Sequence, residues 1–448
     1  MGSLAMQFND EQNLDLLAQY YDSGNNGDTG IYFPNLNYQK PSNLEDAELR
    51  DGYSTDLDPQ TRRLLLNANY HHSDVLGQDF YLQASYRKED DNFYPFPYYN
   101  TGKPVGSKGV YFAASQQNFE VTSLKALFAK EWQAFKFTYG VDLDRERFNA
   151  EQSTFDQRIS SDSGGLDLDT VSKAPRYPSY RVDGLSGYGQ LDWYATDNLT
   201  VSGGARRQQM HVEVGHFKGV EGGSNDYAVS LYNLGTIYDF KNGHQVWINY
   251  GEGFDLPDPA KFYGKPGLSV ADNPLAGIKS RQVETGWRFS DSDWDAQAAL
   301  YYIWSDKVLT TDSATLTIDV IDQKSRDYGF EGALTRHFQS GWDAGGTLHL
   351  VRSEEEGSDG DWIKRDARYA SLSKSTVFVG WKGDKTSARV QGNHAFTLED
   401  DADHTISGYT TFDLLGSRDT EFGTFSGGIQ NLLDKQYSTV WGQRATLF

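Results

Sequence analysis

Apolar and polar side chains alternate along most of this chain, in stretches of about ten residues. The stretch 78–87 is representative, because every second position from Phe80 to Tyr86 is apolar. The positions between them, and Arg87 after them, include the polar residues Gln83 and Ser85. Successive side chains of a β-strand point to opposite faces, so this stretch predicts a strand with one apolar and one polar face.

The alternating stretches come in pairs, and about nine hairpins are predicted from them. Each pair is joined by a short turn, of which Asn242-Gly243 is the strongest signal. Long connections separate the hairpins, at residues 22–60, 88–120, 145–184, 208–228, 253–280 and 351–372. Short turns at one end and long loops at the other are typical of an all-β, antiparallel transmembrane β-barrel, which is the fold class we expect.

The composition of the chain is consistent with the predicted membrane barrel. The mean hydropathy of −0.65 is polar, but a membrane barrel gives a weak signal because only every second residue faces lipid. The net charge of −22 argues against nucleic acid, which demands a basic surface. The absence of cysteine excludes a disulfide framework and a thiolate metal site.

Tryptophans are concentrated on strands or beside the short turns. Seven of them are expected to form an aromatic girdle at the level of the lipid headgroups, namely Trp132, Trp193, Trp247, Trp287, Trp294, Trp342 and Trp381. The alternative, that aromatic residues are simply common in strands, stays open at this point.

Several strings resemble the TonB-dependent siderophore receptors of Gram-negative outer membranes, and among these the ferric aerobactin (hydroxamate) receptors. They occur in the family's order over nearly the whole chain: Phe93–Pro97, Arg176–Tyr180, Asp255–Gly264, Val283–Phe289, Gly408–Ser417, Asn431–Asp434 and Thr439–Ala445. The resemblance implies a large barrel in outer-membrane lipid, with about 22 strands and a plug in the family. It also implies a ferric siderophore as ligand and TonB as partner.

Departures from the family pattern shape the domain prediction. Aligned by hairpins, the chain starts at the family's fourth strand and stops just after the twenty-first, which leaves about 18 of about 22 strands. We therefore expect residues 1–448 to be one barrel domain truncated at both ends, without the plug, the TonB-contacting box or the last strand. Such a fragment is expected to be inactive as a transporter by itself, because open strand edges in lipid are costly.

Aromatic and basic residues of the long loops are the candidate ligand contacts. A ferric hydroxamate–citrate complex is anionic and partly apolar, so guanidinium or ammonium groups suit its carboxylates and aromatic rings suit its body. For any one residue, the alternative is that it only holds a loop on the rim. The candidates are Tyr94, Phe96 and Tyr98; Arg176, Tyr177 and Tyr180; Lys261 and Tyr263; and Trp441 and Arg444.

No catalytic or metal-binding pattern is present, so we expect neither an enzyme nor a cofactor or protein-bound metal. The siderophore itself holds the iron. The acidic runs 354–361 and 399–403 depart from a calcium loop and are expected to be solvated. Three alternatives remain: a family member for another siderophore, a soluble all-β carbohydrate-binding or hydrolytic protein, and a non-functional remnant of a receptor.

Overall fold

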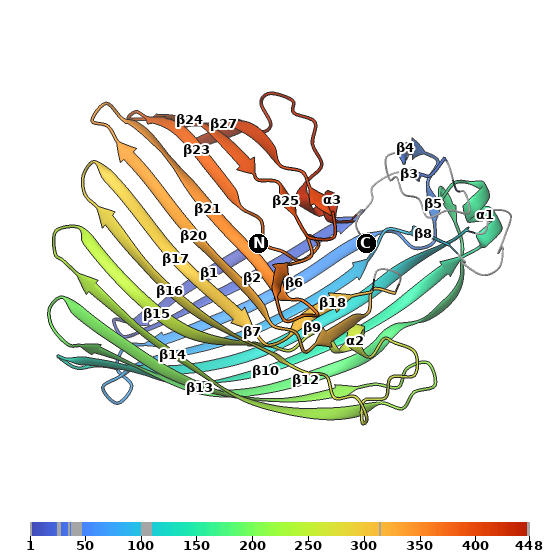
Figure 1. Cartoon of the computed structure of the whole chain (residues 1–448), viewed down its shortest axis with the longest axis horizontal. Coiled ribbons are helices and arrows are strands. Elements are labelled where there is room, and N and C mark those ends of the chain that lie inside the picture. Colours follow the sequence, from blue (N-terminus) through green and yellow to red (C-terminus); the bar gives the residue numbers. More distant parts are fainter. Residues whose placement is uncertain are drawn as a thin grey trace.

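A single antiparallel sheet dominates the fold. The computed structural model describes residues 2–24, 28–34, 36, 47–99, 110–312 and 315–445. Within them, 20 strands form one continuous sheet that curls into a barrel wall (Figure 1). Among these residues, no helix is long and apolar enough to cross a membrane.

Nine hairpins account for 18 of the 20 strands, which confirms the predicted hairpins and strand number. They are β1 (Gly2–Asn9) with β2 (Gln12–Gly24), β6 (Gln60–His72) with β7 (Asp79–Asn92), β9 (Val110–Glu131) with β10 (Phe135–Phe155), β12 (Thr170–Tyr194) with β13 (Leu199–Val214), β14 (Gly223–Asp239) with β15 (His244–Asp255), β16 (Ile278–Ser290) with β17 (Trp294–Ser305), β20 (Ser325–His337) with β21 (Trp342–Glu356), β23 (Lys374–Lys382) with β24 (Thr386–Ala395), and β27 (Tyr409–Thr420) with β28 (Gly423–Ile429).

Neighbouring hairpins are joined edge to edge in chain order, from the β2–β6 pair to the β24–β27 pair. Two short strands complete the sheet: β8 (Phe96–Tyr99) pairs with β9, and β22 (Trp362–Lys364) pairs with β21. Within the described residues, no pairing joins β1 to β28.

The remaining elements are short and belong to the long connections, at the end of the sheet opposite the short turns (Figure 1). The strands are β3 (Thr29–Tyr32), β4 (Glu48–Asp51), β5 (Ser54–Thr55), β11 (Asp167–Leu168), β18 (Val308–Thr311), β19 (Ile318–Ile321), β25 (Leu398–Glu399) and β26 (Thr405–Ile406). The helices are α1 (Gln157–Asp162), α2 (Pro259–Phe262) and α3 (Val440–Ala445).

Alternation places apolar residues on the outer face of the wall and polar residues on the inner face. Leu124, Leu143 and Leu185 lie directly opposite one another on β9, β10 and β12, and all three are exposed. One position along, the opposing residues are Lys125 and Asp142, which point to the other face. An exposed apolar outer face is the side that lipid covers, and it counts against the soluble alternative.

Three of the seven tryptophans are placed as a girdle requires, and one is not. Trp193, Trp287 and Trp342 lie on the outer face near the short turns and are exposed. Trp247 points to the inner face instead, where its indole Nε1 donates to Glu284 Oε1 at 2.8 Å. An inward tryptophan needs a partner for its N–H, and the paired carboxylate supplies it.

The strands are longer than the alternation predicted. The pairing of β9 with β10 continues without a register shift to Ala113 and Thr154, and β12 already begins at Thr170. Much of the predicted loops 88–120 and 145–184 is therefore strand. Beyond the lipid both faces of a hairpin are in water, so the apolar alternation ends while the backbone pairing continues.

Candidate functional site

Two clusters of buried side chains organise the loop end of the barrel. The first contains Phe33, Tyr53, Phe112, Phe155 and Leu168 and packs around α1 and the β3–β5 segment. The second packs α2 against β12, and its main members are Tyr177, Tyr180, Val212, Ala260, Tyr263 and Leu275. Most predicted contact residues belong to these clusters or border them.

The loop around α2 is built by local hydrogen bonds. The Asp258 carboxylate caps the helix by accepting from the Ala260 and Lys261 amides at 2.9 and 3.3 Å, and Pro259 occupies the first turn, where its missing N–H costs nothing. Burial raises the pKa of Asp258 despite these bonds. Ala260 is buried, whereas Lys261 stays partly exposed.

Tyr263 is a structural residue of this loop. Its hydroxyl accepts from the Leu275 amide at 2.9 Å and from Asn225 Nδ2 at 2.8 Å, and donates to the Asn273 carbonyl at 2.9 Å. Burial raises the pKa of Tyr263. With only 3% of its surface exposed, Tyr263 holds the loop on the rim, as the alternative for single candidates anticipated.

Tyr180 and Tyr177 form the wall behind the α2 loop. The Tyr180 hydroxyl donates to Glu146 Oε1 at 2.6 Å, and its ring stacks on Phe148 at 5.3 Å. Tyr177 is 5% exposed, and its ring lies against Gly264, where an added Cβ would approach Tyr177 Cδ1 to 2.8 Å. Both tyrosines therefore present little free surface to a ligand.

Arg176 lies at the open border of this wall. Its guanidinium sits 5.3 Å from the centre of the Tyr177 ring and interacts electrostatically with Tyr111. Tyr111 stacks on Tyr98 at 5.6 Å, and Tyr98 in turn acts on Tyr177. The structure thus brings together Tyr98 and Arg176, which belong to two candidate sets far apart in the sequence.

Within the first candidate set, Tyr94 and Phe96 differ in role. Tyr94 is tied to the β3 segment, since its hydroxyl accepts from the Ile31 amide at 2.7 Å and its ring stacks on Tyr53 at 5.5 Å. Phe96 is 42% exposed. Its ring lies edge-on to the rings of Phe33 and Tyr98, with distances between ring centres of 6.1 and 6.3 Å. Phe96 and Tyr98 therefore offer aromatic surface beside Arg176.

Sequence reasoning missed three aromatic and basic residues of the inner wall and the loop end. Tyr111 opposes Tyr98 across the β8–β9 ladder, and Arg87 stands 4.9 Å from the Phe119 ring on the inner face. Arg87 is exposed and acts electrostatically on Glu146, the partner of Tyr180. The alternation of the strand places Arg87 on the inner face, and the sheet register brings it beside Phe119, below the loop end. We name Phe96, Tyr98, Tyr111 and Arg176 the mouth cluster.

The fourth candidate set lies on α3, apart from the mouth cluster in all its described contacts. Arg444 donates from Nε to the Ala367 carbonyl at 3.1 Å and from Nη2 to the Ala370 carbonyl, and burial lowers its pKa. Arg444 therefore ties α3 to the 365–373 connection. Trp441 is 79% exposed and free to contact a ligand.

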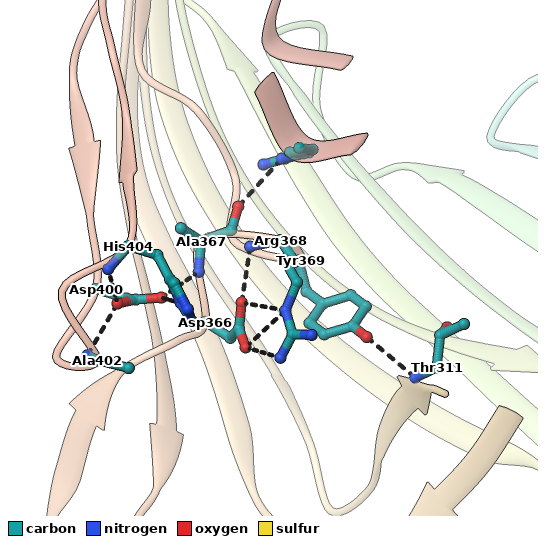
Figure 2. A network of polar contacts seen from close by, with 9 residues as sticks. Thr311, Asp366, Ala367, Arg368, Tyr369, Asp400, Ala402 and His404 are labelled. Carbon is teal, nitrogen blue, oxygen red and sulfur yellow. Dashed lines mark hydrogen bonds and ion pairs between the residues drawn. The ribbon is translucent and has the colours of Figure 1, made fainter. Parts of the chain in front are cut away.

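Three ionisable side chains meet in the neighbouring loops, as Figure 2 shows: Asp366, Asp400 and His404 have potential ligand atoms within 4.8 Å of one another. Each carboxylate is already engaged. Asp366 forms an ion pair with Arg368 at 2.5 Å, and Asp400 accepts from the Ala367, Ala402 and His404 amides and from His404 Nδ1 at 2.8–2.9 Å. The network explains the cluster as a loop anchor, so we assign no metal to it.

This anchor corrects the prediction that both acidic runs are solvated. Asp400 is 6% exposed and Glu354 is 3% exposed. Glu354 is paired with Arg326 and Arg352, both at 2.5 Å. Arg352 and His404 lie close by in sequence, but Arg326 and the Ala367 amide lie 28 and 33 residues away from Glu354 and Asp400, so the runs by themselves could not reveal these partners. Burial opposes ionisation of Asp400, but its hydrogen bonds outweigh that and lower its pKa to about 2.

Comparisons with known proteins agree with this architecture. The family model described as "TonB dependent receptor-like, beta-barrel" matches residues 3–432. A rhizobactin receptor of Rhizobium meliloti (strain 1021) is 37% identical over 99% of this chain and 63% of its own length. A ferric aerobactin receptor of Klebsiella pneumoniae is 34% identical over 100% of this chain and 65% of its own length. The chain thus spans slightly under two thirds of these relatives.

Solved structures show the same fold at low identity. The copper transporter OprC superposes with a TM-score of 0.73 at 15% identity, over 98% of this chain and 66% of that one. The unliganded ferric citrate transporter FecA gives a TM-score of 0.70 at 15% identity, over 97% and 64%. At this identity the likeness concerns the fold alone.

Proposed function

This chain belongs to the family of TonB-dependent receptor-like β-barrels, and we propose that it forms the barrel of a receptor that imports a ferric siderophore. The family places it in the outer membrane of a Gram-negative bacterium, and it is a receptor family and not an enzyme family. We treat residues 1–448 as one barrel domain. In this proposal TonB supplies the energy for import.

The observation that carries the proposal is the mouth cluster. It combines the exposed Phe96 ring and the partly exposed Tyr98 ring with the guanidinium group of Arg176. Arginine binds carboxylates through paired N–H donors, and aromatic rings cover apolar parts of a ligand. This combination suits an anionic, partly apolar chelate, in a chain whose net charge of −22 otherwise repels anions.

We assign the ligand to the hydroxamate, aerobactin-like class. The names of two relatives, the rhizobactin and ferric aerobactin receptors, support this class. An iron already enclosed by the siderophore requires no ligand from the protein, so the receptor needs no cofactor of its own. Arg176, Phe96 and Tyr98 are the proposed first contacts, and Lys261 and Trp441 are proposed as further contacts outside the mouth cluster. Tyr94, Tyr177, Tyr180, Tyr263 and Arg444 support the loops that carry them.

Uptake of radiolabelled ferric aerobactin tests the proposal. The protein, with any sequence that naturally flanks this chain, is produced in iron-starved cells that lack their own receptor. We expect uptake that requires TonB. A matched strain that also lacks TonB is the control for the energy source.

Two other outcomes separate the alternatives. Uptake of a different ferric siderophore alone would keep the receptor and change its ligand. Absence of all uptake, with the folded protein present in the outer membrane, would contradict the proposed function for this chain.

A further inference from the structure

The hairpin formed by β18 (Val308–Thr311) and β19 (Ile318–Ile321) stands between two parts of the loop end. One part is the turn at residues 366–370, to which Arg444 ties α3. The other part is the wall formed by Tyr177 and the α2 loop, beside the mouth cluster. The hairpin contacts both parts, so it connects the support of α3 with the support of the mouth cluster.

The 366–370 turn is fixed by its own hydrogen bonds. The Asp366 carbonyl accepts from the amides of Tyr369 and Ala370, both at 2.9 Å. The Asp400 carboxylate accepts from the Ala367 amide, also at 2.9 Å. Both alanines are buried. The turn therefore presents the Tyr369 side chain to the hairpin in a defined orientation.

Tyr369 joins this turn to the hairpin. Its hydroxyl accepts from the Thr311 amide at 3.0 Å, as Figure 2 shows. Thr311 is the last residue of β18 and lies opposite Ile318 of β19, and Ile318 is buried. One side-chain hydroxyl thus links two loops whose bonded residues are 58 positions apart in the sequence.

The other side of the hairpin supports Tyr177. The Tyr177 hydroxyl donates to the Thr315 carbonyl at 3.5 Å. Gly264 of the α2 loop contacts both sides of this joint, since an added Cβ would approach Tyr177 Cδ1 to 2.8 Å and Thr317 Cγ2 to 3.4 Å. The Arg176 guanidinium lies 5.3 Å from the centre of the Tyr177 ring. The hairpin therefore supports the ring on which Arg176 rests.

The hairpin also holds the α2 loop directly. Asp319 of β19 forms an ion pair with Lys265, whose ammonium lies 5.2 Å from the centre of the Phe262 ring. Val320 packs against the buried cluster that contains Tyr177 and Ala260. A displacement of the hairpin would consequently move the α2 loop as well as Tyr177.

We propose that Tyr369 is a positioning residue of the receptor. Through the β18–β19 hairpin it keeps Tyr177 and the α2 loop in place, and with them the Arg176 guanidinium, in the orientation that binds an anionic ligand. Chains of packed side chains and hydrogen bonds carry energetic coupling between separate sites. The inference rests on the proposed function, in which Arg176 is a first contact, and Tyr369 acts through these contacts without touching the ligand.

The first test needs no siderophore. Tyr369→Phe is introduced into the protein with any sequence that naturally flanks this chain, and hydrogen exchange is followed by mass spectrometry. We expect exchange to become about five-fold faster at the Thr311 amide, the effect of losing one hydrogen bond. The same acceleration is expected at the Phe262 and Tyr263 amides, whose hydrogen bonds to the start of α2 depend on the hairpin.

Tyr232→Phe is the matched control, because it removes a hydroxyl from an outward-facing ring that is 55% exposed. It should change exchange at none of these amides. If Tyr369→Phe accelerates exchange at Thr311 alone, the role of Tyr369 is local and the proposal is wrong. Resistance of the barrel to sodium dodecyl sulfate before heating shows that each variant is folded.

The second test combines two substitutions. Tyr369→Phe is expected to weaken binding of ferric aerobactin about five-fold, and to have no further effect in protein that already carries Arg176→Gln. Such a cycle measures the interaction between two positions. Equal weakening in both backgrounds would mean that Tyr369 does not act through Arg176, and would overturn the proposal.

The two tests also separate this inference from the proposed function. Coupled exchange without any binding of ferric aerobactin would contradict the proposed ligand and keep the role of Tyr369 in holding the α2 loop. Binding without coupled exchange would keep the receptor and overturn the role of Tyr369.

Discussion

The Arg176 guanidinium lies half-exposed over the Tyr177 ring, and among the described residues no carboxylate forms an ion pair with it. Most other arginines at the loop end are occupied, as Arg326 is by Glu354. A cation without a paired carboxylate is free to bind an anionic ligand without first breaking another contact. Arg176 is therefore the residue at which loss of charge has the clearest expected effect.

Arg176→Gln is expected to weaken binding of ferric siderophore about ten-fold. A hydrogen bond to a charged group contributes about 1.5–3 kcal/mol, and 1.4 kcal/mol corresponds to a factor of ten. Equilibrium binding to whole cells measures the effect. Lys173→Gln removes an exposed positive charge from the same strand and serves as control. Equal affinity of the Arg176 variant and the unaltered protein would remove Arg176 from the site.

Asp400 is expected to make the stability of its loop depend on pH. The hydrogen bonds that it accepts lower its pKa from 3.8 to about 2 in the folded state. A lowered pKa contributes stability above the unfolded value, and this stability is lost as pH falls from about 4 to about 2. The contribution is about 2 kcal/mol, since one pKa unit corresponds to 1.36 kcal/mol.

Hydrogen exchange of the Ala367 amide, which donates to Asp400 at 2.9 Å, measures this contribution. Asp400→Asn is expected to accelerate exchange at pH 6, and the unaltered protein is expected to lose protection between pH 4 and pH 2 after correction for intrinsic rates. Asp403→Asn, at an exposed position, is the control and should change neither. Unaltered protection in the Asp400 variant would show that the anchor contributes little.

At the level of elements, the α2 loop depends on one hydroxyl. Tyr263→Phe removes three hydrogen bonds and leaves the buried Leu275 amide without its acceptor. Each unsatisfied buried group costs about 1–3 kcal/mol. We expect faster proteolysis within residues 255–277 and weaker siderophore binding, with the barrel intact.

Limited proteolysis followed by mass spectrometry locates the cleavage. Tyr232→Phe removes a hydroxyl from an outward-facing ring that is 55% exposed and is the matched control. If the two variants are cleaved at the same rate, Tyr263 does not anchor the loop.

The hairpins also show where the sequence pattern predicts the structure correctly and where it does not. The short turns and the apolar alternation were read correctly because both are local: Asn242-Gly243, for instance, forms the turn between β14 and β15, with Gly243 at a φ of 85°. The ends of β9 and β10 that lie farthest from their short turn were predicted to be loop. There the sheet continues with residues such as Phe112 buried under another loop, and a contact with a distant segment leaves no periodic mark.

For the whole molecule, the lipid-covered band is the main constraint on substitutions. Leu300 is 58% exposed on the outer face, near the middle of β17 (Trp294–Ser305). Leu300→Arg is expected to destabilise the barrel by about 2–4 kcal/mol, the cost of an arginine at the middle of a bilayer. Gln282→Arg, on the inner face beside Glu284, should cost much less.

Urea unfolding of the protein folded into lipid vesicles measures both substitutions. Equal destabilisation by the two would mean that the assignment of the faces is wrong.

The sequence by itself determined the strand order, the hairpins, the two faces of the wall and the family. All of these depend on local alternation and on strings of adjacent residues. It also named Phe96, Tyr98 and Arg176 as candidate contacts, but could not tell them from Tyr94 and Tyr263, whose hydroxyls are bound within the loops.

Only the tertiary structure decided which residues share a site. Tyr98 and Tyr111 meet Arg176, because the register of the sheet and the fold of the loops set distant residues side by side. Burial of Asp400 under the 365–373 connection was decided in the same way. Contacts of this kind depend on how the loops fold back on the barrel, and no periodicity along the chain encodes them.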